Sequence, residues 1–133
     1  MSTGIATPDR YTGWVMHHYS AYGLTIESEF QLPELPSLQQ NDETYDVLIC
    51  RGEVDPVSEP AKVTGGRRIH AGPDTCRLSY ESIGSFLVEA GERVVFDPIS
   101  PGVMGTKVVR RLFENEMMGL LLHQRGSVVL HAS

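Results

Sequence analysis

The clearest alternation of hydrophobic and polar positions lies near the end of the chain, between Gly105 and Gly126. Apolar residues recur there every three or four positions, which is the spacing that lines one face of an α-helix. The predicted apolar face consists of Val109, Leu112, Phe113, Met117, Leu120 and Leu121. The predicted polar face contains Arg110, Arg111, Glu114 and Asn115. Thr106 is a suitable N-cap, and Gly126 suits a left-handed C-terminal cap. The pattern therefore predicts one amphipathic helix that covers a core.

The residues that follow the helix, 127–133, read Ser-Val-Val-Leu-His-Ala-Ser. Their β-branched and apolar side chains predict a final buried strand. Because no neighbouring strand follows it in the sequence, we expect an exposed strand edge that favours self-association.

Six segments before the helix have the composition or the alternation of β-strands. They are residues 14–22, 24–29, 45–51, 75–81, 85–90 and 93–97. The third is apolar on both faces and is expected inside the sheet, and the last three are joined by short turns that predict an antiparallel meander. Residues 55–66 contain two prolines and a Gly-Gly pair and predict a surface loop.

Residues 30–40 contain leucines punctuated by Pro33 and Pro36. They predict an extended connection whose leucines pack on the margin of the sheet. A proline-rich ligand for another domain is the alternative interpretation.

Together these elements predict an α+β fold, with a mostly antiparallel sheet and one long C-terminal amphipathic helix followed by a final strand. Residues 1–13 lack periodicity and predict a flexible tail. Residues 14–102 form a β-rich N-terminal domain in this interpretation, and residues 103–133 supply the helix and the final strand.

The charge and the apolar runs of the sequence exclude several classes of protein. The 133 residues include 11 Lys and Arg against 17 Asp and Glu, which gives a formal net charge of -6. This balance argues against a nucleic-acid-binding module, which would gather basic residues on one face. No apolar run is long enough to span a membrane, and the first residues do not resemble a signal peptide. We therefore expect a cytoplasmic protein that binds neither nucleic acid nor membrane.

The residues that could carry chemistry follow none of the common spacings. There is no GxxxxGK[ST] phosphate loop, no CxxC or HExxH metal motif and no GxSxG nucleophile elbow. His17 and His18 are adjacent in a predicted strand and point to opposite faces, so they cannot chelate one ion. Cys50 and Cys76 have apolar neighbours and are predicted to be buried free thiols. These residues alone predict no catalytic, cofactor-binding or metal site.

The last part of the chain resembles a known family. The segment Leu-Leu-Leu-His-Gln-Arg-Gly-Ser-Val-Val-Leu-His-Ala-Ser, residues 120–133, resembles the segment before the phosphate-binding loop of HPr-kinase-like proteins. These are relatives of HPr serine kinase and phosphoenolpyruvate carboxykinase. The runs 19–28 and 32–35, together with Phe96-Asp97-Pro98, resemble earlier parts of the same family. The similarity extends over most of the chain from about Tyr19 onward.

The resemblance implies an ATP-dependent kinase that phosphorylates serine on a protein or peptide, in a group partly associated with the biosynthesis of modified peptides. The sequence stops before the phosphate loop. The resemblance therefore implies the N-terminal, non-catalytic portion of such a kinase, in which residues 103–133 lead toward an absent nucleotide-binding domain. This chain is expected to hold no cofactor, since ATP and Mg²⁺ would require that domain.

His131 resembles the histidine that the family carries just before its nucleotide site, and it is the one candidate for a catalytic role. A strand-end histidine that bonds to a backbone carbonyl is the alternative for this residue. For the whole chain the second hypothesis is a self-standing binding module that recognises a peptide or protein partner at a sheet edge.

Overall fold

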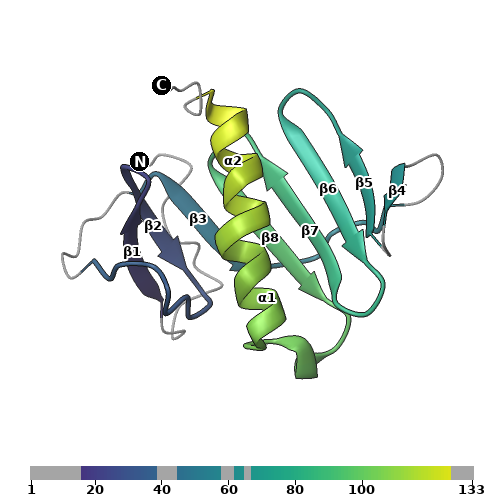
Figure 1. Ribbon diagram of the computed structural model, residues 1–133, viewed down its shortest axis with the longest axis horizontal. Coiled ribbons are helices and arrows are strands. Elements are labelled where there is room, and N and C mark those ends of the chain that lie inside the picture. The colour runs from purple at the N-terminus through teal and green to yellow at the C-terminus, as the bar shows by residue number, and fades with distance from the viewer. Residues whose placement is uncertain (1–15, 39–44, 58–61, 65–66, 127–133) are drawn as a thin grey trace.

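The computed structural model describes residues 16–38, 45–57, 62–64 and 67–126, in which eight strands are followed by a helix (Figure 1). The strands are β1 (His17–Ala21), β2 (Leu24–Ser28), β3 (Val47–Arg51), β4 (Lys62–Thr64), β5 (Arg67–Ala71), β6 (Thr75–Tyr80), β7 (Gly84–Glu89) and β8 (Arg93–Pro98). A 3₁₀ turn (Pro101–Val103) precedes the C-terminal helix, which runs as α1 (Lys107–Arg111), a π-helical segment (Leu112–Met117) and α2 (Met118–Arg125).

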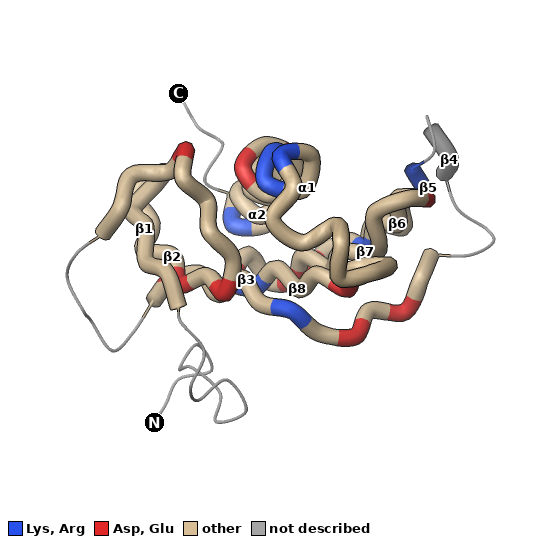
Figure 2. Tube along the Cα trace, turned by 90° about the horizontal axis from the view of Figure 1, so that it is seen from below, with Lys and Arg blue, Asp and Glu red and all other residues tan. Residues whose placement is uncertain are grey.

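The described strands form a single sheet in the order β1-β2-β3-β8-β7-β6-β5-β4. β3 is parallel to both β2 and β8, and every other neighbouring pair is antiparallel. The C-terminal helix crosses one face of the sheet (Figure 1). The segment that follows β3 runs along the opposite face (Figure 2). The molecule therefore has a sheet layer and a helix layer. The segment after β3, residues 52–57, lies on the other face of the sheet, and we call it the strap.

The predicted fold class is wrong in two respects. The sheet was predicted to be mostly antiparallel, and five of the seven neighbouring pairs of described strands are antiparallel, but the sheet is mixed because β3 is parallel to both of its neighbours. The last described element is a helix and not a strand. The predicted final strand, residues 127–133, lies outside the described residues. Alternation of side chains cannot reveal strand direction, and the long connections on either side of β3 permit parallel pairing.

The positions of most strands agree with the hydrophobic pattern. β3 is buried on both faces and lies inside the sheet, and the meander is confirmed as β6, β7 and β8. The prediction of a surface loop over residues 55–66 is wrong in part, because Lys62–Thr64 forms β4 against β5. Leu32 is buried and Leu35 packs against the core, which confirms the packing predicted for this connection.

Both predicted caps of the C-terminal helix are confirmed. The Thr106 hydroxyl oxygen accepts a hydrogen bond from the backbone N–H of Val109 at 3.4 Å. Gly126 has φ 73°, the left-handed conformation that glycine adopts without a steric penalty. Within the described residues, no helix has the length and apolar character needed to cross a membrane.

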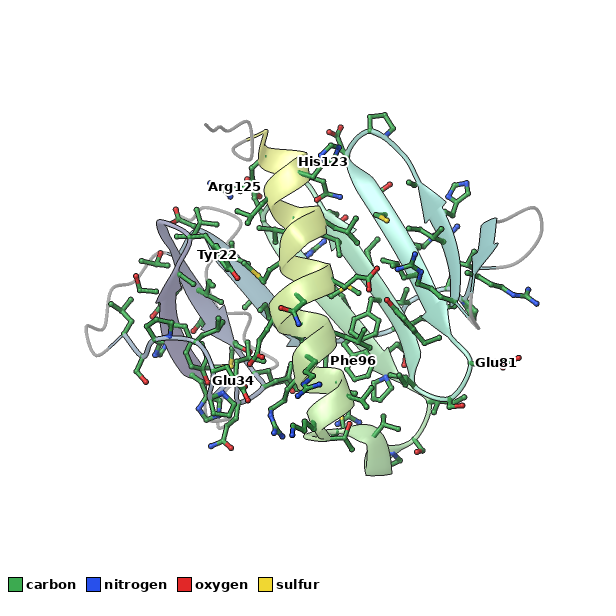
Figure 3. The ribbon with its side chains drawn as sticks, in the orientation of Figure 1. Tyr22, Glu34, Glu81, Phe96, His123 and Arg125 are labelled. Atoms are coloured by element: carbon green, nitrogen blue, oxygen red, sulfur yellow. The ribbon has the colours of Figure 1, made fainter. Side chains whose placement is uncertain are left out.

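The core lies between the helix and the sheet and is centred on Phe113. Its ring lies 5.0 Å from that of Phe30, 5.5 Å from that of Phe86 and 5.7 Å from that of Phe96, measured between centroids. Phe96, on β8, lies beneath the helix (Figure 3). Such aromatic pairs each contribute about 0.5–1.5 kcal/mol beyond the burial of their area. The rings therefore fix the helix at one place on the sheet.

The π-helical segment changes which residues the helix buries. Leu112 and Leu120, predicted on the apolar face, are only partly buried. Met118 and Glu114 are buried instead. A π-helical turn places residues five apart, such as Phe113 and Met118, on the same side, and a pattern read with 3.6 residues per turn cannot show this. The placement of Glu114 on the polar face is therefore wrong.

Candidate functional site

The residues singled out in the sequence are separated in the structure. His131 lies outside the described residues. The Nε2 atom of His18 lies 3.5 Å from Oε2 of Glu27, and its ring stacks on that of Tyr45, so His18 has a structural role. His17, next to it on β1, lines a cavity beside the C-terminal helix.

Metal binding and disulfide formation find no support in the described part of the chain. No group of three or more His, Cys, Asp or Glu side chains is arranged there to hold a metal ion. Cys50 and Cys76 are buried and unbridged, which confirms the prediction of buried free thiols. Burial also raises the pKa of the Cys76 thiol, so this group is a poor nucleophile.

The end of the C-terminal helix is tied to the turn between β7 and β8. The side-chain amide of Gln124 donates to the carbonyl oxygen of Val88 at 2.8 Å and accepts from the backbone N–H of Gly91 at 2.9 Å. The guanidinium of Arg125 donates to the carbonyl oxygen of Gly91 at 2.6 Å. Figure 3 shows Arg125 and His123 at this end of the helix. We call Gln124, Arg125 and the turn they hold the clamp.

The turn in the clamp has a shape that only certain residues permit. Ala90 and Gly91 both have positive φ, at 57° and 64°. A Cβ atom on Gly91 would lie 2.4 Å from Cγ of Arg125. The backbone N–H of Ala90 donates to the carbonyl oxygen of Asp74 at 2.7 Å, which ties the turn to the adjacent turn between β5 and β6. The clamp therefore fixes the point at which the chain leaves the helix.

A second cluster lies near the start of the helix, where two carboxyl groups meet. Glu114, in the π-helical segment, is only 8% exposed and contacts Glu34, which lies in the connection after β2. Burial and the hydrogen bond to Glu34 raise the pKa of Glu114 to about 7. The same hydrogen bond, with help from Arg110 and Arg111, lowers the pKa of Glu34. The pair therefore holds one shared proton near neutral pH.

A cavity of about 300 Å³ is lined by residues that are neighbours of this carboxyl pair in the sequence. One wall is the connection after β2, and the other is the start of the helix. The lining residues are His17, Glu29, Phe30, Gln31, Pro33, Met104, Gly105, Val109, Arg110 and Phe113. Glu34 directly follows one wall and Glu114 directly follows the other.

A larger cavity, of about 400 Å³, lies beneath the sheet between the strap and the ends of β6, β7 and β8. Its polar side chains hold the strap. The Ser79 hydroxyl oxygen accepts from the backbone N–H of Val57 at 2.9 Å, and a carboxylate oxygen of Asp97 accepts from that of Val54 at 3.0 Å. These groups serve the fold rather than a ligand.

The described residues thus offer two working parts, a clamp that positions the exit of the helix and a carboxyl pair that can hold or release a proton. Sequence reasoning missed both. The break in helical spacing between Phe113 and Met118 is the one signal that could have pointed to a buried Glu114. Comparison of the chain with protein-family models, with curated proteins and with solved structures finds no match.

Proposed function

We propose that this chain is the N-terminal, non-catalytic portion of an HPr-kinase-like, ATP-dependent serine kinase. The kinase would act in the cytoplasm on a protein or peptide, in a group linked to modified-peptide biosynthesis. In this role the sheet and the C-terminal helix position the residues that would bind nucleotide and carry out no chemistry of their own.

The observation that supports this proposal most is the overlap between the clamp and the family resemblance. The resemblance rests in part on the run His-Gln-Arg-Gly, residues 123–126. Gln124 and Arg125 in this run grip the turn between β7 and β8, and Gly126 is the helix cap. The residues that suggest the family therefore have a physical task, which is to hold the C-terminal end of the helix on the sheet.

Such a task suits phosphoryl transfer. That reaction depends on placing the nucleotide, the metal ion and the acceptor hydroxyl in one geometry, and misplacement by about 1 Å can cost roughly 10²-fold in rate. The helix end is held by two hydrogen bonds to Gly91 and one to Val88, which fix its position on the sheet. Positioning is therefore a sufficient role for a portion without catalytic groups.

A self-standing binding module is the second candidate, and one observation bears on it. The outer edge of β1 is not bare, because residues 36–38 pair with it. The backbone N–H of Ser20 donates to the carbonyl oxygen of Pro36 at 2.9 Å, and that of Leu38 donates to the carbonyl oxygen of His18 at 2.8 Å. A partner at this edge would first have to displace these residues.

A calorimetric titration of the 133-residue chain with ATP in the presence of Mg²⁺ tests the non-catalytic role. We expect no heat of binding, because the sequence carries no phosphate loop to cradle the phosphates. A dissociation constant in the micromolar range would contradict the proposal. The same titration with ADP and Mg²⁺ would show whether any heat depends on the γ-phosphate.

A further inference from the structure

We propose that the cavity of about 300 Å³ beside the start of the C-terminal helix binds a free amino acid with an apolar side chain, through its carboxylate, its ammonium group and that side chain together. This inference goes beyond the proposed function and does not depend on it. The depth of the cavity, its charges and its fixed walls support the assignment.

The cavity reaches from the surface of the molecule to the core. Phe30, Val109 and Phe113 line it and are buried, whereas Gln31 and Gly105 line it and are exposed. Small-molecule sites are mostly apolar with a few polar groups, and a volume of about 300 Å³ is at the lower end of their range. The ligand is therefore small, with an apolar end that is directed toward the buried side chains.

Two side chains of opposite charge line the same cavity. Arg110 comes from the helix, and Glu29 comes from the connection after β2. Both have intermediate exposure, and partial shielding from water strengthens their attraction for a ligand of opposite charge. A simple carboxylic acid would be attracted by Arg110 and repelled by Glu29, and for a simple amine the reverse would hold. A ligand that carries both charges is attracted by both side chains.

The guanidinium of Arg110 has a donor available for a carboxylate. Its Nη1 donates to the carbonyl oxygen of Gly105 at 2.7 Å, which orients the group. Its Nε is buried and has no hydrogen-bond partner among the described residues. Oε1 of Glu34, which Figure 3 labels, lies 4.0 Å from this Nε and is too distant to accept. A buried donor without a partner is unfavourable, so a ligand carboxylate that accepts from Nε would stabilise the site.

The carboxylate of Glu29 is held in place by the sheet. Its Oε1 accepts from the backbone N–H of Arg51 at 2.8 Å, and the backbone N–H of Glu29 donates to the carbonyl oxygen of Ile49 at 2.9 Å. A carboxylate offers about four lone-pair sites, so Glu29 can accept from a ligand ammonium group in addition to its contacts within the protein.

The walls of the cavity are fixed by contacts within the protein. The backbone N–H of Phe30 donates to the hydroxyl oxygen of Ser28 at 2.9 Å, and that hydroxyl donates to the carbonyl oxygen of Phe30 at 2.8 Å. The backbone N–H of Leu32 donates to the hydroxyl oxygen of Tyr19 at 2.8 Å. The rings of Phe30 and Phe113, 5.0 Å apart between centroids, join the two walls. A site formed in advance binds its ligand without the cost of ordering these groups.

Calorimetric titrations of the 133-residue chain with a matched series of ligands test the proposal. The probe is L-leucine. The controls are 4-methylpentanoate, which lacks the ammonium group, 3-methylbutylamine, which lacks the carboxylate, and L-alanine, which lacks most of the apolar side chain. We expect L-leucine to bind at least about tenfold more tightly than each control, since a hydrogen bond to a charged group contributes about that factor. No binding of L-leucine, or equal binding of L-leucine and any control, would overturn the inference.

Two variants assign each charge of the ligand to its partner. Arg110→Gln should weaken binding of L-leucine and 4-methylpentanoate about tenfold but not that of 3-methylbutylamine. Glu29→Gln, which keeps an acceptor for the N–H of Arg51, should weaken binding of L-leucine and the amine but not that of the acid. A general loss of structure would weaken all three ligands, so it cannot produce these opposite selectivities.

Arg111→Gln is the matched control for Arg110→Gln, because Arg111 is exposed and does not line the cavity. This variant should bind every ligand as the unmodified chain does. If Arg110→Gln does not fold, the ligand series on the unmodified chain and on Glu29→Gln decides the question. Unchanged binding of L-leucine in Glu29→Gln, or a loss in Arg111→Gln as large as that in Arg110→Gln, would overturn the assignment.

Discussion

The proton shared by Glu34 and Glu114 links two elements that are 80 positions apart in the sequence. A buried carboxyl group is stable in the folded state only when it is neutral or paired. Glu114 is kept neutral up to a pH of about 7 by its burial and by the contact with Glu34. The stability of the fold therefore depends on pH through the ionisation of one residue, Glu114.

The free energy of unfolding should fall as the pH rises from about 4.5 to about 7. Across this window the folded chain keeps the proton on Glu114 whereas the unfolded chain has lost it, since the pKa rises from 4.5 to about 7 on folding. The unfolded state then binds fewer protons, so its relative stability increases with pH. Glu34 changes the free energy of unfolding with pH in the opposite direction. Its lowered pKa contributes stability that is lost as the pH falls below 4.5.

Urea unfolding at pH 5 and pH 8 measures this effect. The urea midpoint of the unmodified chain should be lower at pH 8, and Glu114→Gln should remove most of the difference. Glu116→Gln serves as the matched control, because its partner is Arg67. If Glu114→Gln shows the same change of midpoint as the unmodified chain, the assignment of the proton to this pair is wrong.

Gly91 is the second residue whose surroundings the structure defines closely. Gly91→Ala should destabilise the fold by roughly 1–3 kcal/mol, because the new Cβ would meet Arg125 and the backbone has positive φ. Gly119→Ala is the control. A Cβ there meets nothing within 4 Å, so alanine should stabilise the helix by up to about 1 kcal/mol. Thermal unfolding of both variants measures the difference, and equal effects would contradict the close packing of the clamp.

At the scale of elements, the clamp is the contact that couples the helix end to the sheet. Gln124→Ala removes a hydrogen bond to Val88 on β7 and one to Gly91 in the turn that follows, and should cost about 1–2 kcal/mol. His123→Ala is the matched control, because the side chain of His123 is exposed. Thermal unfolding compares the two, and a loss in His123→Ala as large as that in Gln124→Ala would show that the clamp does not hold the helix.

Most elements could be predicted from the sequence, because their side chains repeat at two or at three to four residues. The helix caps Thr106 and Gly126 were readable for the same local reason. Strand direction could not be predicted, because the side-chain pattern of β3 is the same whether its neighbours are parallel or antiparallel. β4 is only three residues long and lies between prolines and glycines. The π-helical turn, and with it the burial of Glu114, depends on packing that no local pattern encodes.

At the scale of the whole molecule, the helix and the sheet share one core, and both working parts lie where the helix meets the sheet layer. The clamp holds the end of the helix on the sheet, and the carboxyl pair joins the connection after β2 to the helix. Contacts that fix the helix on the sheet are what we expect of the positioning role proposed above.

Determining the coding sequence directly after the codon for Ser133 tests the central claim most directly. We predict an open reading frame that continues into a GxxxxGK[ST] phosphate loop within roughly twenty residues. A frame that ends at Ser133, or that continues without such a loop, would contradict the assignment of this chain to an HPr-kinase-like kinase.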